Sequence, residues 1–158
     1  MKQTQPTSKP KLGPGEYRPD TAFTRLEDLP RPKIIKERRN YDTLPCPYCG
    51  KPIGRDKVFT RPLHDIGDLV SGRPHELRII YSQHYCSTCD KYFNADLADV
   101  APPRGHYTHR VMALAVRLVV EDGLPYRTAS WHLWRDHRVF VPFATIQNWV
   151  EAGGKKGK

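Results

Sequence analysis

Two short cysteine turns, CPYCG at residues 46–50 and CSTCD at residues 86–90, decide the fold of this chain. They contain all four cysteines of the 158-residue sequence, and 36 residues lie between the two pairs. Cysteines separated by two residues can turn both sulfurs toward one metal ion, and Zn²⁺ prefers four such ligands in a tetrahedron. Gly50, next to the second cysteine, suits a turn that requires a positive φ. The spacing therefore predicts a zinc ribbon, with structural Zn²⁺ bound by Cys46, Cys49, Cys86 and Cys89.

Two other uses of the four cysteines remain open. A rubredoxin-like site would hold iron in the same thiolate shell, and disulfides or a redox-active CxxC would need no metal. The amino terminus has lysines but no apolar segment that would indicate export, and no βαβ pattern surrounds either pair. His64, His75 and His84 lie between the pairs, but four thiolates already complete the shell. We interpret these histidines as polar strand or loop residues.

Composition favours two small units and a tail over one large core. The mean hydropathy is −0.67, and the first 45 residues hold seven of the fifteen prolines. We predict a disordered, basic, proline-rich tail at 1–40, a zinc-ribbon domain at 41–101, a helical domain at 106–154 and a basic tail at 155–158. Five apolar residues near the end of the first segment predict a short helical turn packed on the ribbon: Phe23, Leu26, Leu29, Ile34 and Ile35.

The ribbon segment predicts two strands between the cysteine pairs. Residues 56–65 are rich in β-branched and aromatic residues, and residues 76–85 run directly into Cys86. One interpretation is that the metal only folds this unit. The other adds contacts to nucleic-acid phosphates from four basic residues: Arg55, Lys57, Arg61 and Arg78.

The last third predicts three helices after a hinge at Pro102, Pro103 and Gly105. Apolar residues recur at helical spacing over 108–121, with Thr108 as the cap and Gly123 as the terminator. The second helix opens after Leu124-Pro125 and runs to about residue 135. The third begins at Pro142 and is expected to stop at Gly153-Gly154. The expected buried residues are Val111, Leu114, Ala115, Leu118 and Val119 in the first helix, Ala129 and Leu133 in the second, and Ile146, Trp149 and Val150 in the third.

Three helices with a short link before the last are typical of a helix-turn-helix domain, whose third helix enters the major groove of DNA. The outer face of that helix offers Thr145, Gln147 and Asn148 to base edges. Four basic residues are candidates for phosphate contacts that set register: Arg127, Arg138, Lys155 and Lys156. A three-helix bundle for protein contact is the alternative.

The formal net charge of +9 suits a polyanionic partner. It divides into +4 for residues 1–45, +1 for 46–107 and +4 for 108–158. Because a Zn²⁺ held by four thiolates carries −2, the metallated ribbon by itself is slightly negative. The longest apolar stretch, 111–120, is too short to cross a membrane. We therefore expect a cytoplasmic protein without a small-molecule substrate.

In combination, these motifs resemble the amino-terminal half of bacterial insertion-sequence transposases of the DDE type. The resemblance covers residues 41–152 and rests on CPYCG, on HDIGDLVSGRPHELRIIYSQHYCSTCDKYF with His64-Asp65, and on LPYRTASWHLWRDH with TIQNWV. It implies binding of double-stranded DNA at the terminal inverted repeats of a mobile element. The family continues into a catalytic domain with three carboxylates, which we do not find here. We therefore expect a truncated gene product that does not cleave DNA. The alternatives are a stand-alone DNA-binding regulator, acting on the sites of an intact transposase, and a protein-interaction module.

Overall fold

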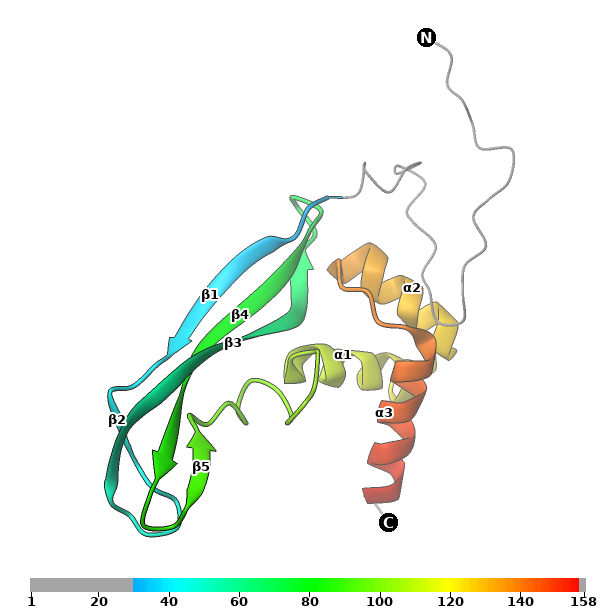
Figure 1. The fold of residues 1–158 in the computed structure, drawn as a ribbon. Helices are drawn as coiled ribbons and strands as arrows, with labels where there is room; N and C mark the ends of the chain where they lie inside the picture. Colours follow the sequence, from blue (N-terminus) through cyan, green and yellow to red (C-terminus); the bar gives the residue numbers. More distant parts are fainter. Residues whose placement is uncertain (1–29, 157–158) are drawn as a thin grey trace. The chain divides into compact units, whose positions relative to one another are not determined.

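The computed structural model describes residues 30–156, with side chains to residue 154 (Figure 1). It divides into two compact units. We call residues 33–65 and 75–109 the sheet unit, and the described residues 30–32, 66–74 and 110–156 the helical unit. The predicted disorder of residues 1–29, with Phe23, Leu26 and Leu29, lies outside the described residues.

The sheet unit contains five strands, in the spatial order β1-β4-β3-β2 with β5 paired to β4. Their bounds are β1 Lys33–Arg39, β2 Thr43–Pro45, β3 Pro52–Asp68, β4 Arg73–Cys86 and β5 Lys91–Asn94. β2 pairs antiparallel with the start of β3, and β5 pairs antiparallel with the end of β4. Each predicted cysteine turn therefore closes a β-hairpin.

A small apolar core lies on one side of the sheet. Leu63 on β3, Leu77 and Ile79 on β4, and Ala101 after β5 form its buried cluster. Leu77, Ile79 and Tyr81 share this side, because alternate residues of a strand face the same way.

The structure corrects the expectation for residues 33–39, which form a strand and neither a helical turn nor a disordered tail. β1 pairs parallel with β4 from Lys33↔His75 to Arg39↔Tyr81, and Ile35 packs against the core cluster. At the end of β1, Arg39 donates to both carboxylate oxygens of Asp99 and to the Asp96 carbonyl, at 2.9 Å for the latter. This pairing lowers the pKa of Asp99. The conformation of this segment thus depends on pairing partners that are distant in sequence, which a local pattern cannot reveal.

The predicted hinge at 102–105 is a tight turn fixed by Arg61. Its guanidinium donates to the carbonyls of Pro102 and Gly105, at 2.5 and 2.8 Å. A Cβ at Gly105 would lie 2.8 Å from the Pro102 ring, so this turn requires glycine.

His64-Asp65 joins β3 to the residues that precede the first helix. His64 forms a parallel bridge with Tyr107, and the buried Asp65 accepts a 2.8 Å hydrogen bond from the Thr108 hydroxyl. Thr108, the predicted cap residue, thus donates its hydroxyl hydrogen bond to this carboxylate.

The helical unit contains three helices in the predicted order: α1 His109–Val120, α2 Tyr126–His137 and α3 Phe143–Lys156. α1 ends as predicted at Gly123, whose φ is +69°, with the Leu124 amide bonded to the Leu118 carbonyl. α3 does not stop at Gly153-Gly154, because neither glycine adopts the left-handed conformation that ends α1. Glycine lowers helix stability by about 1 kcal/mol but does not forbid the helix.

Six of the ten helix residues that were predicted to be buried are buried. Val111, Ala115, Leu118, Ala129, Leu133 and Ile146 are buried. Leu114, Val119, Trp149 and Val150 are only partly buried. The predicted combination of strands around the cysteines and three helices after them is confirmed as an α+β fold: a five-stranded sheet with a four-cysteine cluster, followed by three helices.

The link between α2 and α3 packs against the tip of the β3–β4 hairpin. Arg138 ends α2 in the left-handed conformation, and the Val139 amide bonds to the Leu133 carbonyl. A Cβ at Gly67 would lie 2.7 Å from the Arg73 carbonyl oxygen and 2.9 Å from that of Arg138. Only glycine fits here without displacing backbone.

We predict that Gly67→Ala destabilises the protein by about 1–3 kcal/mol, because the added methyl group overpacks against two backbone oxygens. Gly54→Ala, also on β3, is the matched control, since nothing lies within 4 Å of the position that its added methyl group would take. Urea denaturation at saturating Zn²⁺ measures both. Equal stability of the two variants would contradict the packing described for Gly67.

Candidate metal centre and nucleic-acid interface

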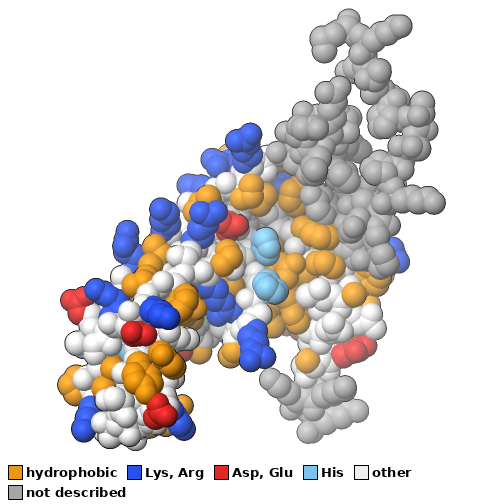
Figure 2. Space-filling model, in the orientation of Figure 1, with side chains coloured by type: hydrophobic (Ala, Val, Ile, Leu, Met, Phe, Trp, Pro, Cys, Tyr) orange, Lys and Arg blue, Asp and Glu red, His pale blue; other side chains and the backbone are white. Residues whose placement is uncertain are grey.

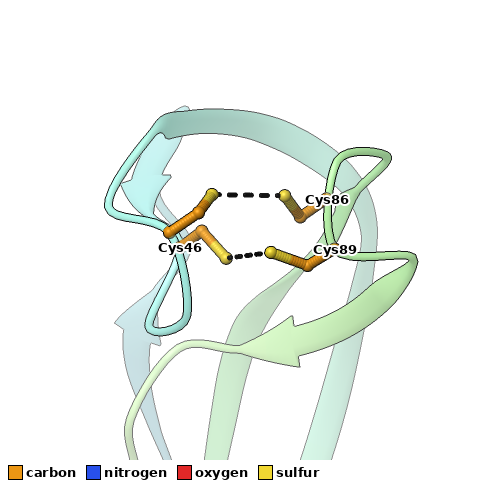
Figure 3. Close-up of side chains that lie close together, drawn as sticks. Cys46, Cys86 and Cys89 are labelled. Carbon is orange, nitrogen blue, oxygen red and sulfur yellow. Dashed lines mark hydrogen bonds between the residues drawn. The ribbon is translucent and has the colours of Figure 1, made fainter.

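The two hairpin turns bring all four cysteine sulfurs together (Figure 3). The β2–β3 turn supplies Cys46 and Cys49, and the β4–β5 turn supplies Cys86 and Cys89. The four sulfurs lie within 4.8 Å of one another. Cys46 and Cys86 are buried, Cys89 is partly buried and Cys49 is exposed.

The sulfur distances fit one tetrahedral ion. The Cys46–Cys89 and Cys49–Cys86 Sγ–Sγ distances are 4.0 and 3.6 Å. Four thiolates about 2.3 Å from a central Zn²⁺ lie about 3.8 Å apart. A disulfide needs about 2.05 Å, and none of the four cysteines forms one. The four sulfurs are thus placed so that they could hold one metal ion, and iron in a thiolate shell needs a similar arrangement.

The local backbone supports the sulfurs. The Tyr48 amide donates to Cys46 Sγ at 3.4 Å, and the Gly50 amide donates to the Cys46 carbonyl at 2.8 Å. Gly50 has a φ of +77°, as its place after the second cysteine predicted. Asp90 holds the same place in the other turn, with a φ of +53° that sequence analysis missed. Asparagine and aspartate tolerate this conformation better than other residues with a side chain.

Side chains also connect the two turns directly. Lys51 Nζ donates to Thr88 Oγ1 at 3.4 Å, and Lys91 Nζ lies 4.4 Å from the Tyr48 ring centre. Each contact joins a residue of one hairpin turn to a residue at the other. Both lysine side chains are exposed, so these contacts add little to the stability of the two turns.

His84 is a structural residue, as predicted, and is not directed at the sulfurs. Its Nδ1 donates to the Ile53 carbonyl at 3.0 Å, so in the neutral ring Nε2 accepts from the Ser82 hydroxyl at 2.8 Å. The ring stacks on Phe93 with centroids 5.2 Å apart. His84 thereby ties β4 to the start of β3 next to the first cysteine turn.

The thiols differ in acidity. Burial raises the pKa of Cys89, and hydrogen bonds with the neighbouring thiols raise it further, to about 12. At Cys46 burial acts in the same direction, but hydrogen bonds from the amides of Tyr48 and Cys49 and from the neighbouring thiols together outweigh it and lower the pKa to about 7. In the metal-free protein at neutral pH, Cys89 therefore keeps a proton that a metal ion must displace.

The predicted base-reading residues lie together on α3. Ile146 is fully buried between them, while Asn148 is exposed and Thr145 and Gln147 are partly exposed. Gln147 Nε2 donates to Glu151 at 3.0 Å, one turn further along the helix. The side-chain amide of Asn148 is the most accessible of the three groups.

The four residues predicted to contact phosphates differ in their exposure. Arg127 is exposed on α2, with its guanidinium 4.4 Å from the Phe143 ring centre at the start of α3. Arg138, by contrast, is only 8% exposed and lies 4.9 Å from the Trp134 ring centre. Its burial at the end of α2 removes it from the surface where the prediction placed it. Lys155 and Lys156 lie in the last turn of α3, and their side chains are outside the described residues.

Most basic residues of the ribbon have protein partners. Arg55 donates to Asn40 and Asp42, at 2.9 and 3.2 Å. Arg78 pairs with Glu76 at 2.5 Å, and Arg61 holds the 102–105 turn. Lys57 is exposed on β3.

Three exposed basic residues were not predicted as candidate contacts. Lys36 and Arg38 lie on β1, which was predicted to belong to a disordered tail, and Arg135 lies on α2. Residues 33–39 (KIIKERR) show no alternation of apolar and charged residues, so the local sequence carries no signal of this strand.

Comparison of the chain with family models, curated proteins and solved structures gives no match. None of the helices in residues 30–156 combines the length and apolar character needed to cross a bilayer.

We predict that Zn²⁺ affinity rises with pH around neutrality, because the Cys89 proton must leave before its sulfur binds the ion. Each proton displaced makes the apparent affinity increase about tenfold per pH unit. Competition with a chromophoric chelator at pH 6.5 and 7.5 measures the change. In Cys89→Ser the number of protons released falls by one, and a pH-independent affinity of the wild-type protein would contradict the assignment.

Proposed function

We propose that this chain binds duplex DNA in a sequence-dependent way and acts as the end-binding portion of an insertion-sequence transposase. In this proposal the sheet unit is a scaffold folded by a structural Zn²⁺, and α3 reads bases in the major groove. Binding and positioning are the whole activity proposed for the described residues.

The observation that carries the proposal is the geometry of α2, the link and α3. The Ser130 hydroxyl donates to the Val141 carbonyl at 2.5 Å, and Val139 and Val141 are buried. This fixed link sets the direction in which α3 leaves α2. Ile146 is buried and holds α3 against the core. Thr145 and Asn148 lie near the amino-terminal end of the helix, which is the end that contacts bases in helix-turn-helix proteins.

The charge distribution supports a nucleic-acid partner over a protein partner. Residues 108–158 have a net charge of +4, and Arg127 and Arg135 are exposed on α2 beside α3. Basic residues flanking a polar recognition face are typical of DNA-binding modules. The resemblance of the cysteine, strand and helix motifs to insertion-sequence transposases supports the narrower assignment to element ends.

Zinc is the metal that we propose for the four-cysteine site. Four thiolates with no open position fit structural Zn²⁺, which would supply folding free energy and no catalytic chemistry. Elemental analysis of protein purified without added metal tests this directly. One zinc per chain supports the proposal, whereas iron with a thiolate charge-transfer spectrum would replace it with the rubredoxin-like alternative.

We predict that Gln147→Ala combined with Asn148→Ala lowers discrimination between a selected duplex and its shuffled counterpart about tenfold or more, because each paired base contact is worth about 1–3 kcal/mol. Binding should remain salt-dependent, since the phosphate contacts are kept. Competition between the two duplexes measures the ratio.

Arg117→Gln is the control for this measurement. Arg117 is exposed on α1 and pairs with Glu121 at 3.3 Å, away from the proposed reading residues in sequence. It should preserve discrimination. Unchanged discrimination in the double variant would show that α3 is not the reader, and absence of duplex binding by the wild-type protein would favour the protein-interaction alternative.

A further inference from the structure

β1 changes the charge of the sheet unit. It brings Lys33, Lys36, Arg38 and Arg39, against the single acidic Glu37, to a segment with a net charge of only +1. With β1 included, residues 33–107 carry +3, so the unit stays positive even with a −2 zinc–thiolate centre. Figure 2 shows Lys and Arg side chains gathered along β1 and the neighbouring sheet surface.

Two of the four positive groups of β1 lie on the side of the sheet opposite the apolar core. Ile35 packs on the core cluster, and side chains alternate along a strand, so Lys36 and Arg38 face away from that core. Both side chains are exposed. The parallel register places Lys36 next to Arg78 of β4, on the same face.

The acidic groups near this face are already engaged. Glu76 accepts from Arg78 Nε at 2.5 Å on the same face. Glu37 and Asp99 both pair with Arg39, whose position in β1 alternates with Lys36 and Arg38. Lys36 and Arg38 are thus the positive excess of this face, which we call the β1 face: Ile34, Lys36, Arg38, Glu76, Arg78 and Ile80.

We infer that the β1 face is a second binding surface for the phosphate backbone of duplex DNA, separate from the residues of α3. The inference rests on the proposed function, because it takes DNA as the polyanion. Lys36 and Arg38 lie about 6.8 Å apart along an extended strand, and a duplex presents one charge every 3.4 Å or so along each strand of its backbone. Two cations at twice that spacing can face alternate phosphates of one DNA strand. Such contacts add affinity and salt dependence without reading sequence.

The test is the salt dependence of binding to a mixed-sequence duplex by the full-length, zinc-loaded protein. Lys36→Gln with Arg38→Gln should reduce the magnitude of the slope of log K against log salt by about 1–2, at roughly 0.9 per phosphate contact. Lys51→Gln with Lys91→Gln is the matched control. It removes the same charge from the same unit, from side chains that contact Thr88 and Tyr48 instead of lying on the β1 face.

Zinc content and circular dichroism verify folding of each variant, and Lys36→Arg with Arg38→Lys should keep the wild-type slope. Duplex binding by the wild-type protein with an unchanged slope in the β1 variant would overturn this inference and leave the proposed function standing. An equal loss in both neutralised variants would also overturn it, because net charge alone would explain the result. No salt-dependent duplex binding by the wild-type protein would overturn both proposals.

Discussion

The meeting of four cysteine sulfurs is the constraint on which the sheet unit depends. The turns that carry them belong to two different hairpins, and each hairpin by itself is too small to be stable. The buried apolar cluster of the unit has only four members, Leu63, Leu77, Ile79 and Ala101. A structural Zn²⁺ contributes of order 10 kcal/mol to folding of small domains, more than a core of this size can supply. Metal binding would therefore decide whether the β2–β3 turn and the β4–β5 turn come together.

The helical unit depends on the conformation of the link between α2 and α3. Its three helices have their own apolar core, and the direction of α3 follows from the conformation of the α2–α3 link. Arg138 in the left-handed conformation and the Ser130–Val141 hydrogen bond set that link. Gly67 leaves room for it against the hairpin tip. The same few residues thereby position Thr145 and Asn148, the groups proposed to meet bases.

Local sequence signals predicted the features that local chemistry controls. Cysteine spacing predicted the sulfur cluster, the run into Cys86 predicted β4, and apolar periodicity with Gly123 predicted α1 and its end. Two of the misses share a physical cause, which is that distant contacts decided them. β1 forms because Lys33–Arg39 pairs with β4, which lies more than forty residues later in the sequence. Arg138 is buried because it lies against Trp134 and near Gly67. α3 passes through Gly153-Gly154 because two glycines weaken a helix without terminating it.

The pairing of β1 and the burial of Arg138 change the expected distribution of charge. A ribbon that is nearly neutral in sequence becomes positive once β1 joins it, and one expected phosphate contact moves into the core. The most direct measurement of the central claim is selection of bound sequences from random duplexes by the purified chain, with zinc measured in the same sample. We expect one zinc per chain and enrichment of a common sequence. Zinc-loaded, folded protein that enriches no sequence would contradict the central claim.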